Sequence, residues 1–265
     1  MKNLFLLSFA IFFFACNNVA DKTTSLEKSA ASLKGKPVET SQRPVKEINS
    51  VYKFTGNINN SIPVFIWFVV KDNIIKGELI YLKTKKQLPI TLIGTIDEED
   101  CRIHEFQNDG NVTGTYVGNI SNKEFKGSWY ATASEKELAF KLTAKDTILE
   151  TVDADFHPST VTGTYSYQFG KKGPQGGLEV KKINDSLVSL DINCVTRAPA
   201  YNIAETKADS IALKNGTSEY KIPDTKCMYR ISFFKNFLVI NHINKEFDCG
   251  FGNNADIQGV FIKTK

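Results

Sequence analysis

The pentapeptide V-T-G-T-Y occurs twice in this chain, at residues 112–116 and 161–165. It belongs to a looser pattern in which glycine lies midway between two apolar residues four positions apart, repeated at 75–79, 125–129 and 257–261. In a strand, residues at i, i+2 and i+4 share one face. The glycine then leaves a notch beneath a large side chain or lets the strand bend at a barrel corner. We interpret the repeat as a structural device of β-barrels, and its recurrence as a sign of two similar modules.

Short runs of β-branched and aromatic residues, separated by Asn, Asp, Gly and Lys, fill the chain from Val51 onward. Runs at this spacing, without an amphipathic helix between them, are typical of antiparallel sandwiches and barrels. The sequence therefore predicts an all-β fold of two small antiparallel β-barrel or sandwich modules in tandem. The expected strands are 52–58, 63–70, 74–82, 88–96, 101–106, 111–118, 125–131, 137–142, 161–169, 177–182, 187–194, 210–214, 218–222, 228–233, 237–242 and 257–263.

A break at 147–160, which contains Asp153, Asp155 and Pro158, separates a first domain (51–146) from a second (159–265). Each block has a usual domain size and enough expected strands to close a small barrel. The first block has the general look of lipocalin-like barrels, an analogy of fold alone. One continuous β-structure across both blocks is the alternative.

The amino terminus predicts export. A short cationic start precedes an apolar run over residues 4–15, as in a signal peptide, and this run is too short for a spanning helix. Residues 17–50 contain no aromatic residue and are rich in Ser, Thr, Lys, Ala and Glu. Such a composition cannot bury enough apolar surface to order itself. We therefore expect a signal peptide over 1–15 and a disordered, flexible tether over 16–50.

Phe14-Ala15-Cys16 resembles the lipobox of bacterial lipoproteins. The resemblance implies that the Cys16 thiol carries lipid and that the peptide is cut before it. Acyl chains hold a soluble domain at a membrane because each buried CH₂ stabilises attachment by about 0.8 kcal/mol. By the sorting habit of that family, Asn17 favours the outer membrane. The expected location is thus the cell envelope, as an outer-membrane lipoprotein facing the periplasm or the surface.

The formal net charge of +4 is small and dispersed. Lys2 and a surplus of two bases in 17–50 account for most of it, and basic and acidic residues alternate throughout the rest of the chain. A nucleic-acid-binding protein would need a basic stripe that neutralises phosphates. We therefore expect no nucleic-acid partner.

Four cysteines follow Cys16, an even number that suits an oxidising compartment. Three pairings are open. Cys227 opens one expected strand and Cys249 follows the next, so we expect a Cys227–Cys249 disulfide that closes a loop of 22 residues. Cys101 and Cys194 either pair across the blocks or stay buried as thiols. The spacings C-x₂₋₄-C and H-x₃₋₅-H are absent, so no zinc site is expected.

The second block contains A-Y-N-I-A-E at 200–205, Cys227 with I-S-F at 231–233, and C-G-F-G at 249–252 before G-V-F-I-K at 259–263. Over 161–265 this looks like a β-rich module that ends many secreted bacterial proteins and lipoproteins and has no assigned activity. The resemblance implies a small disulfide-closed barrel rather than a reaction. Phe261 stands where tyrosine is commoner in that module, a conservative change for packing.

Motifs for catalysis and cofactor binding are missing from the sequence. It lacks G-x-S-x-G, H-E-x-x-H, a P-loop and G-x-G-x-x-G. The glycine-rich basic stretch 170–177 is interpreted as a hairpin turn, and the acidic run 97–100 as a solvated turn. His104 and Glu105 should point to opposite faces of a strand, while His157 is remote in sequence and His242 ends a strand. We therefore expect neither catalytic residues nor a metal or cofactor.

Three classes of function remain. We favour a non-catalytic binding or inhibitory module that holds an apolar or carbohydrate ligand, or a partner protein of the envelope. Its candidate contacts lie in the polar loop 197–202 and on the two tryptophans, namely Arg197, Tyr201, Asn202, Trp67 and Trp129. A structural accessory subunit of an outer-membrane complex is the alternative, and an enzyme with an unrecognised site is the third class.

Overall fold

Alternating burial defines the strands. In Leu187–Val195, for example, every second side chain from Val188 to Cys194 is buried and those between are not, which is the period of a sheet with one covered face. The computed structural model describes residues 50–146, 156–158, 160–244, 246 and 248–265. The expected signal peptide, Cys16, nearly all of the tether and most of the 147–160 break lie outside them. The described part contains no helix of the length and apolarity that a membrane crossing needs.

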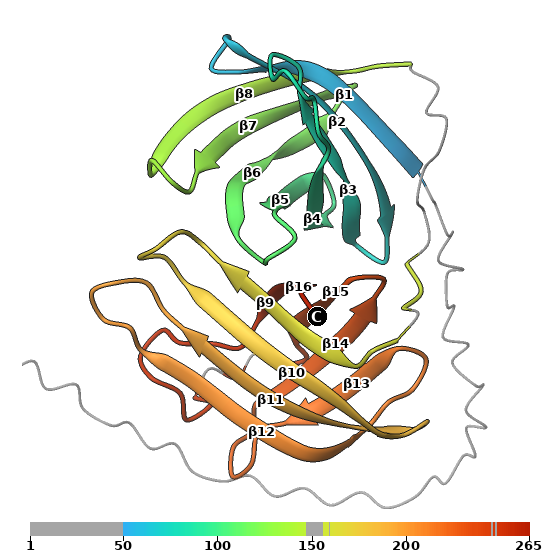
Figure 1. Cartoon of the computed structure of the whole chain (residues 1–265), viewed down its shortest axis with the longest axis vertical. Helices are drawn as coiled ribbons and strands as arrows, with labels where there is room; N and C mark the ends of the chain where they lie inside the picture. The colour runs from blue at the N-terminus through green and yellow to red at the C-terminus, as the bar shows by residue number, and fades with distance from the viewer. Residues whose placement is uncertain (1–49, 147–155, 159, 245, 247) are drawn as a thin grey trace, which may run out of the picture. The chain divides into compact units, whose positions relative to one another are not determined.

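The first eight strands form a closed antiparallel barrel, the first barrel, drawn in blue to green in Figure 1. Each strand pairs with the next, and the eighth returns to pair with the first through Phe54–Ile58 and Phe140–Ala144. The strands are β1 (Ser50–Ile58), β2 (Ile62–Lys71), β3 (Ile74–Tyr81), β4 (Ile90–Asp97), β5 (Asp100–Phe106), β6 (Val112–Ser121), β7 (Glu124–Ala131) and β8 (Lys136–Ala144).

The last eight strands form a second antiparallel sheet in the order β12-β11-β10-β9-β16-β15-β14-β13. Its two edges, β12 and β13, are joined by the Tyr220 hydroxyl, which lies 2.6 Å from Thr206 Oγ1 and 3.1 Å from the Lys207 carbonyl. The strands are β9 (Gly163–Gln168), β10 (Gln175–Asn184), β11 (Leu187–Val195), β12 (Ile203–Ala212), β13 (Thr217–Lys221), β14 (Met228–Phe234), β15 (Phe237–His242) and β16 (Gly259–Lys263). The predicted fold class, two antiparallel barrel-like modules, is confirmed.

Aromatic rings fill the first barrel. Phe125 contacts Phe140 at 4.6 Å and Phe54 at 5.6 Å between ring centroids, and Tyr116 meets Phe140 edge-on at 5.1 Å. All four side chains are at most 3% exposed. Burying each contributes about 1.5–3 kcal/mol, and ring pairs at such angles add about 0.5–1.5 kcal/mol. The interior of this barrel is thus a packed core.

The two copies of V-T-G-T-Y make room for different neighbours. A Cβ on Gly114 would lie 2.5 Å from Trp129 Nε1 and 2.8 Å from the Glu105 carboxyl carbon. A Cβ on Gly163, where φ is +141°, would lie 2.3 Å from the Lys265 carbonyl oxygen. Both glycines therefore serve close packing, but one admits side chains inside the first barrel and the other admits the end of the chain.

The expected disulfide is confirmed, because Cys227 and Cys249 are bonded with a Cα separation of 5.4 Å. Cys101 and Cys194 are free and buried. Of the two alternatives expected for them, the structure therefore has buried thiols and not a second disulfide. Burial raises the pKa of each thiol to about 12. At neutral pH both are therefore protonated and poor nucleophiles.

Candidate functional site

The predicted contact loop 197–202 folds as a closed turn between β11 and β12. The Thr196 amide donates to the Asn202 carbonyl and the Asn202 amide donates to Thr196 Oγ1, each at 2.9 Å. Asn202 Nδ2 then donates to the Asn253 carbonyl at 2.7 Å, and the Gly252 amide donates to the Ile203 carbonyl at 2.9 Å. These bonds place the C-G-F-G segment beside the loop. The second glycine of that motif, Gly252, allows this close approach, because a Cβ on it would lie 3.0 Å from the Asn202 Cβ.

Asp256 fixes the segment that follows C-G-F-G. Its Oδ1 accepts hydrogen bonds from the Tyr229 hydroxyl at 2.8 Å and the Gln258 amide at 3.1 Å, and its Oδ2 lies 2.8 Å from His242 Nε2. The rings of Tyr229 and His242 pack at 4.2 Å between centroids. Burial, and then the bond to Asp256, raises the pKa of Tyr229 above its ordinary value. His242, at the end of β15, therefore anchors a loop.

The loop 197–202 and the segment that contains Asp256 enclose a cleft of about 630 Å³, which we call the 197–202 cleft. Arg197, Asn202, Asn253 and Asn254 supply its polar lining. The remaining lining residues are Tyr167, Pro174, Val195, Thr196, Ala198, Pro199, Ala200 and Asp256. Tyr201 projects from the same loop and is 48% exposed. The structure thus places two of the predicted contacts, Arg197 and Asn202, in the lining of one concave surface, while Tyr201 lies on the same loop and is not among the lining residues.

The two tryptophans do not join them and do not face each other. Trp67 lies between Ile66 and Phe68, whose side chains are in the core of the first barrel. Its own side chain is therefore on the outer side of β2, where Nε1 donates to Glu78 Oε2 at 3.3 Å. Trp129 belongs to the core. These two side chains therefore do not line a common cavity, which would have favoured a binding module.

Trp129 leads to a buried acid that the sequence reasoning missed. Glu105 is 1% exposed; its Oε1 accepts from Trp129 Nε1 and the Tyr81 hydroxyl, both at 2.8 Å, and its Oε2 accepts from Thr113 Oγ1 at 3.0 Å. Burial raises the pKa of Glu105, and the three donors partly oppose that rise. Because solvent does not reach this carboxyl, we assign it to the core rather than to a binding site. The sequence did contain the relevant pattern, since the alternation of Cys101 and Ile103 with polar residues predicts that Glu105 points inward.

Neighbouring His104 points to the opposite face from Glu105, as expected. Its Nδ1 lies 2.9 Å from Thr115 Oγ1, the residue opposite it on β6. Burial, and then the charge of Arg102, lowers the pKa of His104 to about 4. His104 is therefore neutral at physiological pH and forms no dyad with Glu105. His157 is exposed, and no group of three or more His, Cys, Asp or Glu side chains suited to a metal ion occurs among the residues that the structure describes.

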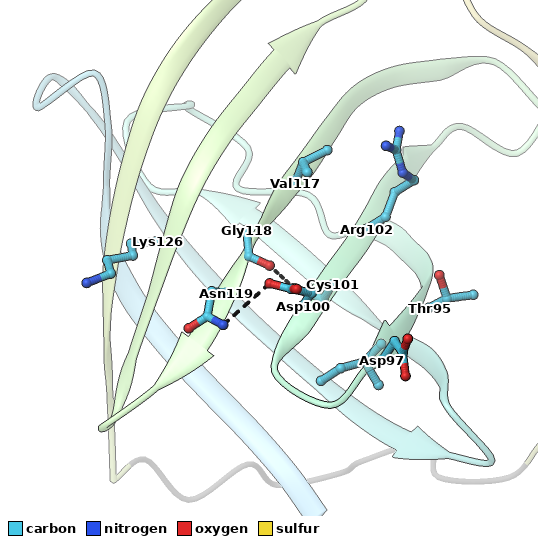
Figure 2. Close-up of a pocket in the computed structure, with 10 residues that line it drawn as sticks. Thr95, Asp97, Asp100, Cys101, Arg102, Val117, Gly118, Asn119 and Lys126 are labelled. Carbon is cyan, nitrogen blue, oxygen red and sulfur yellow. Dashed lines mark hydrogen bonds between the residues drawn. The ribbon is translucent and has the colours of Figure 1, made fainter. Parts of the chain in front are cut away.

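A second hollow, of about 650 Å³, lies on the wall of the first barrel over β4 to β7 (Figure 2). The acidic run contributes Asp97 and Asp100 at the ends of β4 and β5, so the predicted turn is confirmed. Asn119 donates to Asp100 at 3.4 Å. Figure 2 shows Lys126, Arg102 and Thr95 pointing away from one another. Side chains that diverge in this way cannot surround a ligand, so the 197–202 cleft is the better candidate.

Comparison with known proteins yields no match to a family model, to a curated protein or to a solved structure. The resemblances to the lipobox and to the secreted C-G-F-G module therefore stay predictions from the sequence.

Proposed function

We propose that this chain is a lipid-anchored protein of the cell envelope that acts as a non-catalytic binding or inhibitory module, with the 197–202 cleft as its ligand site. The observation that supports this most is the convergence of Arg197, Asn202 and the Asn253–Asn254 pair on one concave surface. Ligand sites are typically concave, with a few polar groups that fix orientation.

A carbohydrate suits this cleft better than an apolar molecule. The side chains of Asn253 and Asn254 are exposed at its rim, and amides both donate and accept hydrogen bonds, as sugar hydroxyls do. Tyr201 offers an aromatic ring on the same loop. The first barrel, by contrast, is filled by its own aromatic side chains.

Binding is tested with the full chain in detergent, using isothermal calorimetry against oligosaccharides released from bacterial envelopes. Tyr201→Ala should weaken binding about threefold to tenfold, because an aromatic contact is worth about 0.5–1.5 kcal/mol. Tyr130→Ala is the matched control, since Tyr130 is 40% exposed on β7 of the first barrel and should bind as wild type. If no oligosaccharide binds and a protein co-purifies instead, the carbohydrate proposal is wrong. That result would support the alternative function, a structural accessory subunit of an outer-membrane complex.

The anchor is tested separately, because Cys16 lies outside the described residues. After fractionation of bacteria that express the chain, the wild-type protein should sediment with membranes. Cys16→Ser should move it to the soluble fraction or leave an uncleaved precursor, because the thiol that carries lipid is gone. Unchanged membrane association of a processed Cys16→Ser chain would remove the lipoprotein proposal.

A further inference from the structure

The hairpin between β9 and β10 brings two more cations to the 197–202 cleft. Its turn is closed by the Phe169 amide, which donates to the Pro174 carbonyl at 2.9 Å, and Pro174 itself lines the cleft. The Ala198 amide donates to the Lys172 carbonyl at 2.8 Å. The glycine-rich basic stretch is therefore a hairpin turn, as predicted, and it is bonded to the loop that carries Arg197.

The side chains of Lys171, Lys172 and Arg197 are exposed, and none forms a salt bridge with a residue that the structure describes. Some exposed cations elsewhere on the same sheet do have partners: Lys182 pairs with Asp185, and Arg230 pairs with Glu219 at 3.0 Å. Three neighbouring cations without a carboxylate partner create a positive potential at the cleft.

The acid in the cleft offsets only one of these three positive charges. Asp256 is the carboxylate among the lining residues, and both of its oxygens are already engaged by Tyr229, Gln258 and His242. Asn202 Nδ2 is likewise committed to a backbone carbonyl. The groups left to meet a ligand are the Arg197 guanidinium and the side-chain amides of Asn253 and Asn254. The two lysines of the hairpin are not among the lining residues.

We propose that the 197–202 cleft selects an acidic saccharide, with Arg197 binding the acid group and the two asparagines binding sugar hydroxyls. This inference rests on the proposed function and adds its ligand class. A guanidinium presents parallel N–H donors that match a carboxylate or phosphate in a bidentate way. Lys171 and Lys172 act at longer range by attracting the anion, an effect that salt screens.

The experiment measures binding by the full chain in detergent to trigalacturonate, to its methyl ester, which has the same shape without charge, and to neutral maltotriose. The wild-type protein should bind the acid more tightly than the ester by a factor of about ten or more, because hydrogen bonds to charged groups are stronger than those to neutral groups. Arg197→Gln should abolish that preference. Lys171→Gln/Lys172→Gln should weaken binding at low salt and little at high salt. Arg102→Gln, an exposed arginine on the first barrel, is the matched control and should change nothing.

Equal binding of acid and ester, or an Arg197→Gln variant that keeps the preference, would overturn the acidic ligand while leaving a carbohydrate-binding role intact. If none of the three saccharides binds and envelope oligosaccharides fail as well, both proposals fall. Glucose 6-phosphate distinguishes the acid group: binding of this probe but not of trigalacturonate, lost in Arg197→Gln, would support the proposal and assign phosphate in place of carboxylate.

Discussion

Gly114 is the residue on which the Glu105 cluster depends. Its missing side chain leaves the space that Trp129 Nε1 and the Glu105 carboxyl occupy, at 2.5 and 2.8 Å from an added Cβ. Gly114→Ala should therefore lower the free energy of unfolding by about 2–3 kcal/mol, in the range of overpacked cores. Gly177→Ala is the control, because a Cβ there meets nothing within 4 Å, and it should be neutral or slightly stabilising. Urea denaturation measures both, and equal effects would show that the notch is not needed.

Glu105 itself should make stability depend on pH. Its pKa is raised above the ordinary value of 4.5 in the folded state, so its contribution is full below the unfolded pKa and is lost as the pH rises through the folded pKa. Glu105→Gln keeps an acceptor for Trp129 and Tyr81 without the charge. We therefore expect the variant to match wild type near pH 4 and to exceed it near pH 8 by thermal denaturation. A stability difference that does not change with pH would contradict this.

Glu105→Leu completes that test. It leaves the Tyr81 hydroxyl and the Trp129 indole N–H without their buried acceptor. Each unmet donor costs about 1–3 kcal/mol, so this variant should be destabilised at both pH values. The contrast between Gln and Leu separates loss of charge from loss of hydrogen bonds.

Single-residue placement was the hardest feature to predict from the sequence. For Glu105, the face of the strand on which the side chain lies could be predicted, because Cys101 and Ile103 alternate with polar residues. For Trp67, the face could not be predicted. This residue lies in a run over 62–70 that is apolar on both faces, so the sequence pattern does not distinguish the inward side. The Arg197–Asn202 loop was predicted as polar, but its neighbours Asn253 and Lys172 come from segments distant in sequence, which only the folded sheet brings together.

At the scale of elements, each of the sixteen expected strands has a counterpart, and β12 differs most. The sequence predicts 210–214, whereas the strand runs from Ile203 to Ala212. Its first seven residues, I-A-E-T-K-A-D, include few that favour strands. Hydrogen bonds to the neighbouring strand stabilise this segment as a strand, because residues 203–208 form a continuous ladder with 190–195 of β11. Hydrogen bonds to a neighbouring strand leave little trace in the residue pattern of the strand itself.

The Cys227–Cys249 disulfide holds β14 to the loop that lines the cleft. Its closed loop of 22 residues predicts a loss of about 3 kcal/mol when it is removed, on the loop-entropy model. Reductant should therefore lower the melting temperature of the wild type. It should leave Cys227→Ser/Cys249→Ser unchanged, because Cys101 and Cys194 are free thiols. A melting temperature that reductant does not shift in the wild type would mean that the bond contributes little.

At the scale of the whole molecule, the two sheets have separate strand ladders, since β8 closes back onto β1 and β9 pairs with β10 and β16. An isolated bridge links them, in which the Gln168 amide at the end of β9 donates to the Gly110 carbonyl at 2.9 Å. Neither sheet takes a named strand from the other in the described part of the chain. That each block also folds independently stays a prediction. Limited proteolysis that spares 147–160, or fragments that lose their sheet signal in circular dichroism, would favour one continuous structure. We expect cleavage in that break to release two fragments that each keep cooperative unfolding, because a closed barrel needs no edge partner and the disulfide closes its loop within the second block.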